Sequence, residues 1–189
     1  MPYSDSSRHD VLPMQMSDLI NRTRRGEPAA LAEVYGRYSE SLMRLAWRLT
    51  GSADDAEDIL HDVFVGLPEA LRHYDERGSF EPWIKRIIAR TALSAIRAKR
   101  RSRELSLDDH PLIESSERAD SAADSAPIQR AIEALPESLR LVFVLKVMEG
   151  HSHAEISAML GINRGTSEVR LHRAVRALRL ALHSDHDDR

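Results

Sequence analysis

Residues 135–182 read LPESLRLVFVLKVMEGHSHAEISAMLGINRGTSEVRLHRAVRALRLAL. This stretch predicts three consecutive helices, and the last two form a helix-turn-helix. In the first helix, over 136–148, Pro136 suits the N-terminal turn and Gly150 suits the end. Its apolar residues recur at helical spacing, which indicates a helix packed in a core. They are Leu139, Val142, Phe143 and Val147.

Capping chemistry on both sides of one glycine predicts the helix-turn-helix. Ser152 can cap a helix in which Glu155 completes a capping box, and an apolar run follows. Gly161 can adopt the left-handed conformation that ends this helix, and Asn163 can cap the next one. So short a turn between two helices is typical of DNA-binding helix pairs.

The second helix of the pair, over about 164–182, divides into two faces. Ser167, Leu171, Ala174 and Leu178 fall within one narrow arc at about 100° per residue, which predicts the buried face. Arginines dominate the rest of the helix surface, so the helix can enter a groove lined with phosphates. They are Arg164, Arg170, Arg173, Arg176 and Arg179, against the single acid Glu168. A charge run alone usually indicates a solvated helix, but its position after a capped helix and a glycine turn favours DNA binding.

The formal net charge of −3 hides blocks of opposite sign. Residues 84–103 carry eight basic side chains and no acid, whereas residues 104–124 carry seven acids and one arginine. Two basic elements separated by an acidic stretch indicate two nucleic-acid contacts on one chain. Residues 102–127 are rich in Ser, Asp, Ala and Pro, which predicts a flexible acidic linker.

Helical patterns before the linker predict a first domain over 14–101. We expect helices over 16–25, over 28–50 with Gly51 at its end, and from Ser52 onward. Pro68 is expected to interrupt this third helix, so that 68–73 forms a separate turn. A fourth helix is expected to begin after Ser79 and to bury Trp83 in the core.

Two surfaces of this first domain are candidates for binding. The third helix leaves an acidic face outside, which is either solvated or docks on a basic partner. The fourth helix carries a basic face that matches a phosphate-tracking surface, and the loop before it offers Tyr74 and Phe80 for stacking on unpaired bases.

Together these patterns predict an all-α fold with two small helical domains, 14–101 and 128–183, the second a helix-turn-helix domain. Residues 1–13 are expected to be a disordered tail and 184–189 a polar tail. The chain has no cysteine, which excludes thiolate metal sites and agrees with a reducing compartment. No apolar run approaches the roughly 18 residues that span a bilayer, so we expect a cytoplasmic protein without membrane insertion.

Three motifs resemble those of bacterial sigma factors of the small extracytoplasmic-function type, which have two helical domains joined by a linker. Residues 55–64, DAEDILHDVF, are similar to the family's DAED-hydrophobic helix, and residues 80–90, FEPWIKRIIAR, to its F-x-x-W-L-x-R-I-A segment. Residues 165–174, GTSEVRLHRA, are similar to its G-T-V-K-S-R-L-H-R-A recognition helix. The resemblance covers roughly residues 15–182.

The resemblance implies a promoter-specificity subunit of RNA polymerase, with no catalysis, cofactor or metal of its own. Its implied partners are promoter DNA, core RNA polymerase through the beta-prime clamp helices and the beta flap, and an anti-sigma factor. The residues implied for minus-35 DNA are Arg164, Thr166, Glu168, Val169, Arg170, His172, Arg173 and Arg176. Those implied for minus-10 DNA are Tyr74, Arg77, Ser79, Phe80, Lys85, Arg86, Arg90, Ser94 and Arg97. Those implied for polymerase binding are Asp55, Asp58, His61 and Asp62.

The sequence departs from the family pattern at several of these positions. His61 stands where the family often has Gln, and Ser167 replaces a usual Val on the inner face, a loss of burial of about 1 kcal/mol. Glu168 and Val169 replace a basic residue and Ser on the reading face. A carboxylate can accept from cytosine N4 and Val can contact a thymine methyl, so we expect an altered minus-35 preference.

Two other classes of protein share some of these features. An ordinary transcriptional regulator would use the helix-turn-helix on an operator, but it leaves the basic helix at 84–103 without a role. A metal-dependent enzyme could use His151, His153, Glu155 and His172, but alternate side chains at a helix start point apart, which argues against a metal site.

Overall fold

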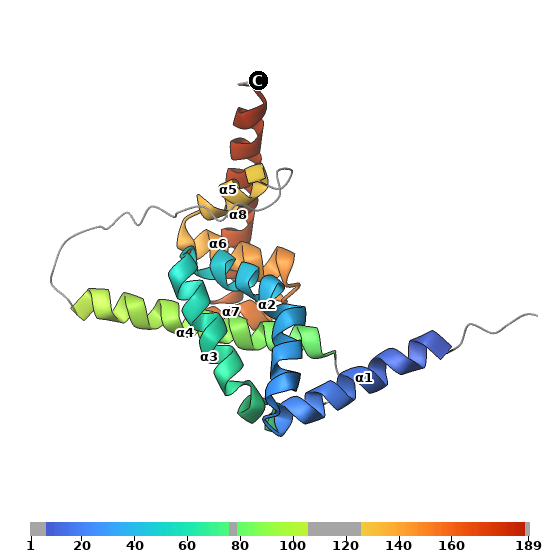
Figure 1. Ribbon diagram of the computed structural model, residues 1–189. Coiled ribbons are helices and arrows are strands. Elements are labelled where there is room, and N and C mark those ends of the chain that lie inside the picture. The colour runs from blue at the N-terminus through green and yellow to red at the C-terminus, as the bar shows by residue number, and fades with distance from the viewer. Residues whose placement is uncertain (1–6, 76–78, 106–125, 188–189) are drawn as a thin grey trace, which may run out of the picture.

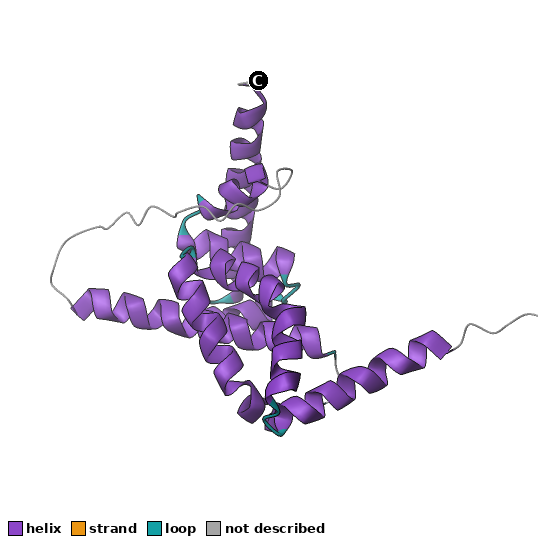
Figure 2. Cartoon of the chain, in the orientation of Figure 1, coloured by secondary structure: helices purple, strands orange, loops and turns teal. Residues whose placement is uncertain are grey.

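A computed structural model describes residues 7–75, 79–105 and 126–187, and all elements within these ranges are helical (Figures 1 and 2). The N-terminal part contains α1 (Ser7–Arg24), α2 (Pro28–Thr50), α3 (Ala53–Ala70), a 3-10 turn (Leu71–His73) and α4 (Phe80–Leu105). The C-terminal part contains α5 (Ala126–Glu133), α6 (Glu137–Phe143), a π-helical segment (Val144–Met148), α7 (His153–Leu160) and α8 (Arg164–Asp187). The all-α fold predicted from the sequence is confirmed. The predicted linker falls largely on residues 106–125, outside the described residues.

Local capping sets the boundaries of the N-terminal helices. Pro28 occupies the first turn of α2, and Gly51, at φ 74°, ends it with its N–H donating to the carbonyl oxygen of Trp47 at 2.7 Å. The Ser52 hydroxyl then accepts from the backbone N–H of Asp55 at 3.2 Å and caps α3. These are the boundaries that the sequence predicts, because a cap depends only on residues a few positions away.

The terminal helices are longer than expected. The helix α1 begins at Ser7, within the stretch expected to be a disordered tail, and α8 continues to Asp187, past the predicted end at Leu182. Adding residues to a helix that is already packed requires no new nucleus, and this favours such extension. Figure 1 shows both helices projecting from the body of the molecule.

The expected interruption at Pro68 is wrong. The helix α3 continues through Pro68 to Ala70, and only Leu71–His73 tightens into a 3-10 turn. Leu67 and Leu71 are both fully buried and hold the backbone on either side of the proline. Arg24 also donates to the Leu71 carbonyl oxygen at 3.0 Å, which fixes the turn against α1. Near a helix end, the proline costs one hydrogen bond, and tertiary packing outweighs it.

The helix over 136–148 changes its winding after Phe143. In the π-helical segment, the N–H of Glu149 donates to the carbonyl oxygen of Val144, five residues earlier, at 3.1 Å. The wider turn shifts the angular phase of the side chains. Val144 and Leu145 are therefore buried, and Val147, predicted in the core, is 55% exposed.

The two helical parts share one continuous core. Of the C-terminal elements, α6 packs against α2 and α7 packs against α4, and buried side chains from both parts join a single cluster. Among the described helices, none is both long and apolar enough to cross a membrane.

Candidate nucleic-acid and polymerase interfaces

The helix-turn-helix is built by three caps. At the start of α7, the Ser152 hydroxyl accepts from the N–H of Glu155 at 3.2 Å, and the Glu155 carboxylate accepts from the Ser152 N–H at 2.8 Å. The bond from the Ser152 N–H, and next the bond that the Ser152 hydroxyl donates to the same carboxylate at 2.8 Å, lower the pKa of Glu155. Gly161, at φ 67°, ends α7, and Asn163 Oδ1 accepts from the Thr166 N–H at 2.7 Å to cap α8. The predicted capping box and turn are confirmed.

The inner face of α8 contains a polar bond that the sequence did not reveal. Ser167 and Ala174 are fully buried and Leu178 nearly so, as the periodicity predicts. The Ser167 hydroxyl lies 2.9 Å from Nδ1 of His153 on α7. The buried hydroxyl is therefore satisfied across the two helices, and the cost expected from replacing Val is offset by a hydrogen bond.

The opposite face of α8 is open to solvent. Its exposed members are Arg164, Gly165, Glu168, Val169, His172, Arg173 and Arg176, whereas Thr166 and Arg170 are half-buried. Arg164 Nε donates to Glu168 Oε1 at 2.8 Å, one turn apart, and this bond lowers the pKa of Glu168. The helix thus presents a cation and an ionised carboxylate as a pair, next to the apolar surface of Val169.

A second basic surface runs along one side of α4. Arg86, Arg90, Ser94 and Arg97 are exposed on successive turns, and Lys85 beside them is half-buried. We call these five residues the α4 basic face. Ser79 is exposed just before the helix, and Arg77 lies outside the described residues.

Tyr74 and Phe80 are not free for stacking in this structure, which corrects the expectation of a loop that presents both rings. They are 8% and 4% exposed, and their ring centroids lie 5.9 Å apart in an edge-to-face contact. The ring centroid of Trp83 lies 4.8 Å from that of Tyr74, and the ring centroid of Tyr38 on α2 lies 5.2 Å from that of Phe80. Aromatic rings bury a large area when they pack together, and here the cluster anchors the start of α4 against α2.

The acidic surface of α3 combines charge with an apolar groove. Asp58, His61 and Asp62 are exposed on one side of the helix, and Val65, one turn further, is 67% exposed. Asp55 instead pairs with Lys99 of α4 at 3.1 Å. Asp58, His61, Asp62 and Val65 form what we call the α3 docking face.

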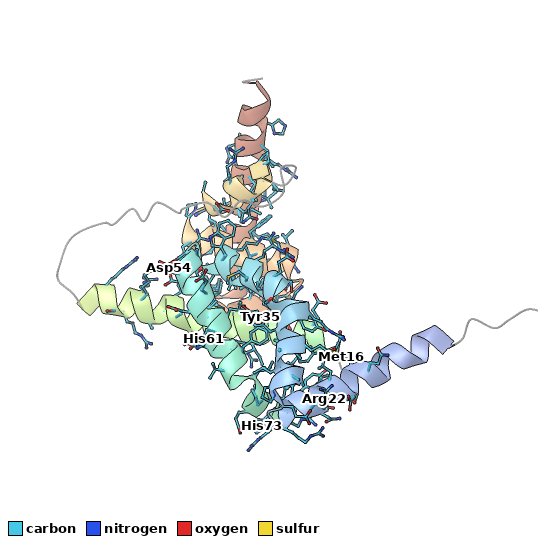
Figure 3. All side chains as sticks on the ribbon, viewed as in Figure 1. Met16, Arg22, Tyr35, Asp54, His61 and His73 are labelled. Atoms are coloured by element: carbon cyan, nitrogen blue, oxygen red, sulfur yellow. The ribbon has the colours of Figure 1, made fainter. Side chains whose placement is uncertain are left out.

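The groove beside this face lies between α2 and α3 and has a volume of about 660 Å³. Its lining includes Tyr35, Phe64, Val65 and His61, and the rings of Tyr35 and Phe64 meet edge to face at 4.9 Å. Figure 3 labels Tyr35 on α2 and His61 on α3. Tyr35 and Val65 are not among the binding residues predicted from the sequence. The spacing of Val65, three and four positions after Asp62 and His61, is the signal that could have found it.

Among the residues that the structure describes, no group of three or more His, Cys, Asp or Glu could hold a metal. His153, one of the residues weighed as a ligand, is bonded to Ser167 instead.

Two family models match the two helical parts of the chain. The family model of sigma-70 region 2 matches residues 34–102, from α2 to α4, and that of sigma-70 region 4 matches residues 125–178, which include the helix-turn-helix. The chain is an ECF sigma factor of the sigma-70 family. Sigma factors are non-enzymatic initiation factors, so the metal-dependent enzyme is excluded, and the match to both regions decides against an ordinary regulator.

Several curated sigma factors are similar over most of the chain. The ECF sigma factor SigE of Mycolicibacterium smegmatis is 34% identical over 84% of this chain, which spans 66% of that relative. SigW of Bacillus subtilis is 27% identical over 90% of this chain and 98% of its own length.

Two solved structures share the fold. The sigma factor RpoE, in complex with the anti-sigma factor NepR from Bartonella quintana, has a TM-score of 0.55 and 21% identity, with 82% of this chain and 97% of that chain covered. CnrH, in complex with the cytosolic domain of CnrY, has a TM-score of 0.52 and 24% identity, with 88% and 96% covered.

Proposed function

We propose that this sigma factor binds core RNA polymerase through the α3 docking face, reads minus-35 DNA with α8 and engages melted minus-10 DNA with the α4 basic face. The observation that carries this assignment is the open, arginine-rich face of α8 behind an intact capped turn, on the same chain as a second basic helix. One DNA surface would suffice for an ordinary regulator, whereas a promoter has two elements.

The reading face of α8 suits a major groove. Arg173 and Arg176 are exposed and positioned for phosphates or guanine edges, as is Arg164 at the start of the helix. Glu168 and Val169 lie on the same face, and they are the positions at which this chain departs from the family pattern. We assign the altered minus-35 preference to this pair.

The α4 basic face suits a single strand. Its arginines follow one side of the helix and can track successive phosphates. Tyr74 and Phe80 support this surface because they fix the start of α4 from beneath. Unpaired bases would then stack on other side chains, or on these rings after the aromatic cluster rearranges.

The α3 docking face suits the clamp helices of the beta-prime subunit. Asp58, His61 and Asp62 provide charge and polar contacts, while Val65 and Tyr35 add exposed apolar area of the kind found at the centre of protein interfaces. The helix-turn-helix domain would touch the beta flap. This sigma factor would act in the cytoplasm, where core polymerase and promoter DNA are found.

An anti-sigma factor is a further partner that we propose. The solved structure of the sigma factor RpoE from Bartonella quintana contains the anti-sigma factor NepR. A partner of this kind would cover polymerase-binding surfaces such as the α3 docking face.

The decisive experiment is reconstitution of the purified chain with bacterial core RNA polymerase on a library of randomised promoters, with sequencing of the transcripts. Two spaced upstream motifs shared by the transcripts are the expected result. Binding to duplex DNA with no core binding and no transcripts would contradict the proposal.

The docking face is tested by charge reversal. We expect Asp62→Arg to weaken core binding at least tenfold, because it places a cation where a basic partner should dock. Glu40→Arg, an exposed reversal on α2 about 140° around that helix from Tyr35, is the matched control and should leave core binding unchanged. Equal core affinity of both variants would overturn the assignment of this face.

A further inference from the structure

We propose that the chain has a binding site for a nucleoside polyphosphate, in a pocket at the junction of α2 and α3 that α4, α5 and α6 also line. The pocket has a volume of about 610 Å³, and small-molecule sites occupy about 300–1,000 Å³. None of the described residues that line it belongs to the α4 basic face, the α3 docking face or the exposed face of α8. The site is therefore separate from the surfaces assigned to polymerase and DNA.

Arg140 of α6, which lines this pocket, is a buried cation without a counter-ion. It is 9% exposed and forms no salt bridge with any described carboxylate. Nη2 donates to the carbonyl oxygen of Thr50 at 3.2 Å and Nη1 to that of Glu133 at 3.3 Å, which are long bonds to neutral acceptors. Nε is buried and has no hydrogen-bond partner among the described residues. Burial lowers the pKa of Arg140, but a guanidinium stays charged.

An anion in the pocket would supply the missing counter-ion. Buried charges are ordinarily paired, because an unpaired charge loses its hydration without compensation. The guanidinium lies directly against the pocket wall at Gly51, where a Cβ would be 2.8 Å from Nη2. The helix α3 begins at Ala53, so the positive end of its dipole, which favours an anion, lies at the same junction.

Three further cations line the pocket from α4. They are Lys99, Arg100 and Arg103, which fall within an arc of about 100° around the helix. Lys99 is held by Asp55 of α3 at 3.1 Å, and Arg103 is exposed. Cations on α6 and on α4 suit an anion that carries several charges, such as a chain of phosphates, better than a single small ion.

The remaining lining of the pocket indicates what the phosphates are attached to. The carboxylates of Glu133 and Glu137 would repel a bare polyanion, but they can accept hydrogen bonds from hydroxyl and amino groups. Ala95 and Ile96 of α4 add apolar surface on which a flat ring can rest. A nucleoside polyphosphate combines phosphates, hydroxyl groups and such a ring in one molecule, and this combination is the reason for assigning that class of ligand.

A ligand in this pocket would contact both helical parts of the chain. It would therefore favour the arrangement of the parts seen here, and by linkage any step that changes this arrangement would depend on the concentration of the ligand. The effect on promoter recognition rests on the proposed function. Binding itself does not, because it is measured on the free chain.

Binding is measured by isothermal titration of the full chain, without DNA or polymerase, with GTP, ATP and inorganic tripolyphosphate in turn. We expect one equivalent of GTP or ATP to bind and to raise the melting temperature, because a ligand that binds only the folded chain stabilises it. Tripolyphosphate should bind about tenfold more weakly, since it has no donor groups for the carboxylates. No binding of any of the three overturns the site, and equally tight binding of tripolyphosphate overturns the nucleoside assignment.

Two exposed arginines of α4 locate the site. Arg103 lines the pocket, whereas Arg101 lies about 200° away around the helix and is the matched control. Arg103→Gln should weaken GTP binding roughly tenfold, as expected for a lost bond between charged groups, and Arg101→Gln should leave it unchanged. Both positions are on the surface, so neither substitution disturbs the core. Equal weakening by both variants would mean that the nucleotide binds to basic surface in general, and would overturn the pocket.

Glu133→Gln tests the class of ligand. It weakens an acceptor that only the nucleoside can use, and it removes a charge that repels the phosphates of both ligands. The affinity for GTP relative to that for tripolyphosphate should therefore fall about tenfold, and an unchanged ratio would overturn the contact with the nucleoside. Transcription by the reconstituted holoenzyme tests the proposed function separately, so either proposal can fail without the other.

Discussion

At the scale of single residues, the exposed face of α8 that we propose reads minus-35 DNA is arranged before any DNA is bound. Arg164 and Glu168 hold each other at 2.8 Å, and the bond from the guanidinium keeps the pKa of the carboxyl low. Glu168 is therefore ionised at the pH at which transcription occurs. It can accept from a cytosine amine or hold Arg164 toward a guanine, and in both roles its charge is needed.

We expect Glu168→Gln to change the minus-35 base preference at one or two adjacent positions, roughly 5- to 150-fold, since that is the range of one good base contact. It should also bind non-specific duplex more tightly, because the substitution removes a negative charge close to phosphates. Sequencing of transcripts from a promoter library measures the first effect. Glu137→Gln, an exposed acid on α6, is the control, and an identical preference in both variants would refute the role of Glu168.

The bond between Ser167 and His153 joins the two helices of the reading motif. Ser167→Ala leaves a partly buried imidazole nitrogen without its partner and should lower the free energy of unfolding by about 1 kcal/mol. A double-mutant cycle with His153→Ala should give a coupling of about 0.5–1.5 kcal/mol in chemical denaturation. Ser138→Ala on the exposed side of α6 is the control. No coupling would mean that the contact contributes nothing to the motif.

At the scale of elements, the sequence predicted what is decided locally. Gly51, Ser52 and Asn163 act through residues three or four positions away, and each ends or begins a helix where expected. Pro68 and Val147 were misjudged because the result depends on partners elsewhere in the fold. The buried leucines around Pro68 and the π-helical segment before Val147 override the local pattern.

The candidate binding surfaces also differ in whether the sequence could predict their exposure. The exposed face of α8 follows from periodicity alone, because one helix determines it. The burial of Tyr74 and Phe80 depends on Tyr38 from α2, and the engagement of Lys85 and Arg97 depends on the C-terminal part, so a reading of each segment by itself could find neither.

Two glycines allow the contact of Arg140, on α6, with the end of α2 to be separated from backbone strain. Gly26 and Gly51 both have positive φ, 79° and 74°, so alanine at either costs about 1–2 kcal/mol. A Cβ at Gly26 meets nothing within 4 Å, whereas at Gly51 it meets the guanidinium at 2.8 Å. Gly51→Ala should therefore lower the free energy of unfolding, measured by chemical denaturation, more than Gly26→Ala does. Equal losses would mean that Arg140 moves aside freely.

At the scale of the whole molecule, the proposed function requires the two helical parts to separate. Elements named for positions 35 and 10 base pairs upstream lie about 85 Å apart along B-form DNA at 3.4 Å per base pair. Here α7 packs against α4, so both DNA surfaces belong to one body. About twenty residues of chain reach at most roughly 70 Å when extended, so the covalent connection permits a wide separation. Promoter recognition by this sigma factor then requires opening.

Core polymerase is the component expected to open the chain, because in the proposed function it contacts both parts at separate sites. Any ligand that binds only the separated parts gains apparent affinity when contacts between the parts are weakened, in proportion to the open fraction. Arg140 of α6 donates to the carbonyl oxygen of Thr50, the last residue of α2, at 3.2 Å. Arg140→Gln should therefore bind core several-fold more tightly than wild type, up to about tenfold, and Arg130→Gln, at an exposed position on α5, should not. Competition against labelled wild-type chain for limiting core polymerase measures this directly. If Arg140→Gln competes no better, core polymerase accepts the two parts as they are packed here, and the opening step belongs to promoter DNA instead.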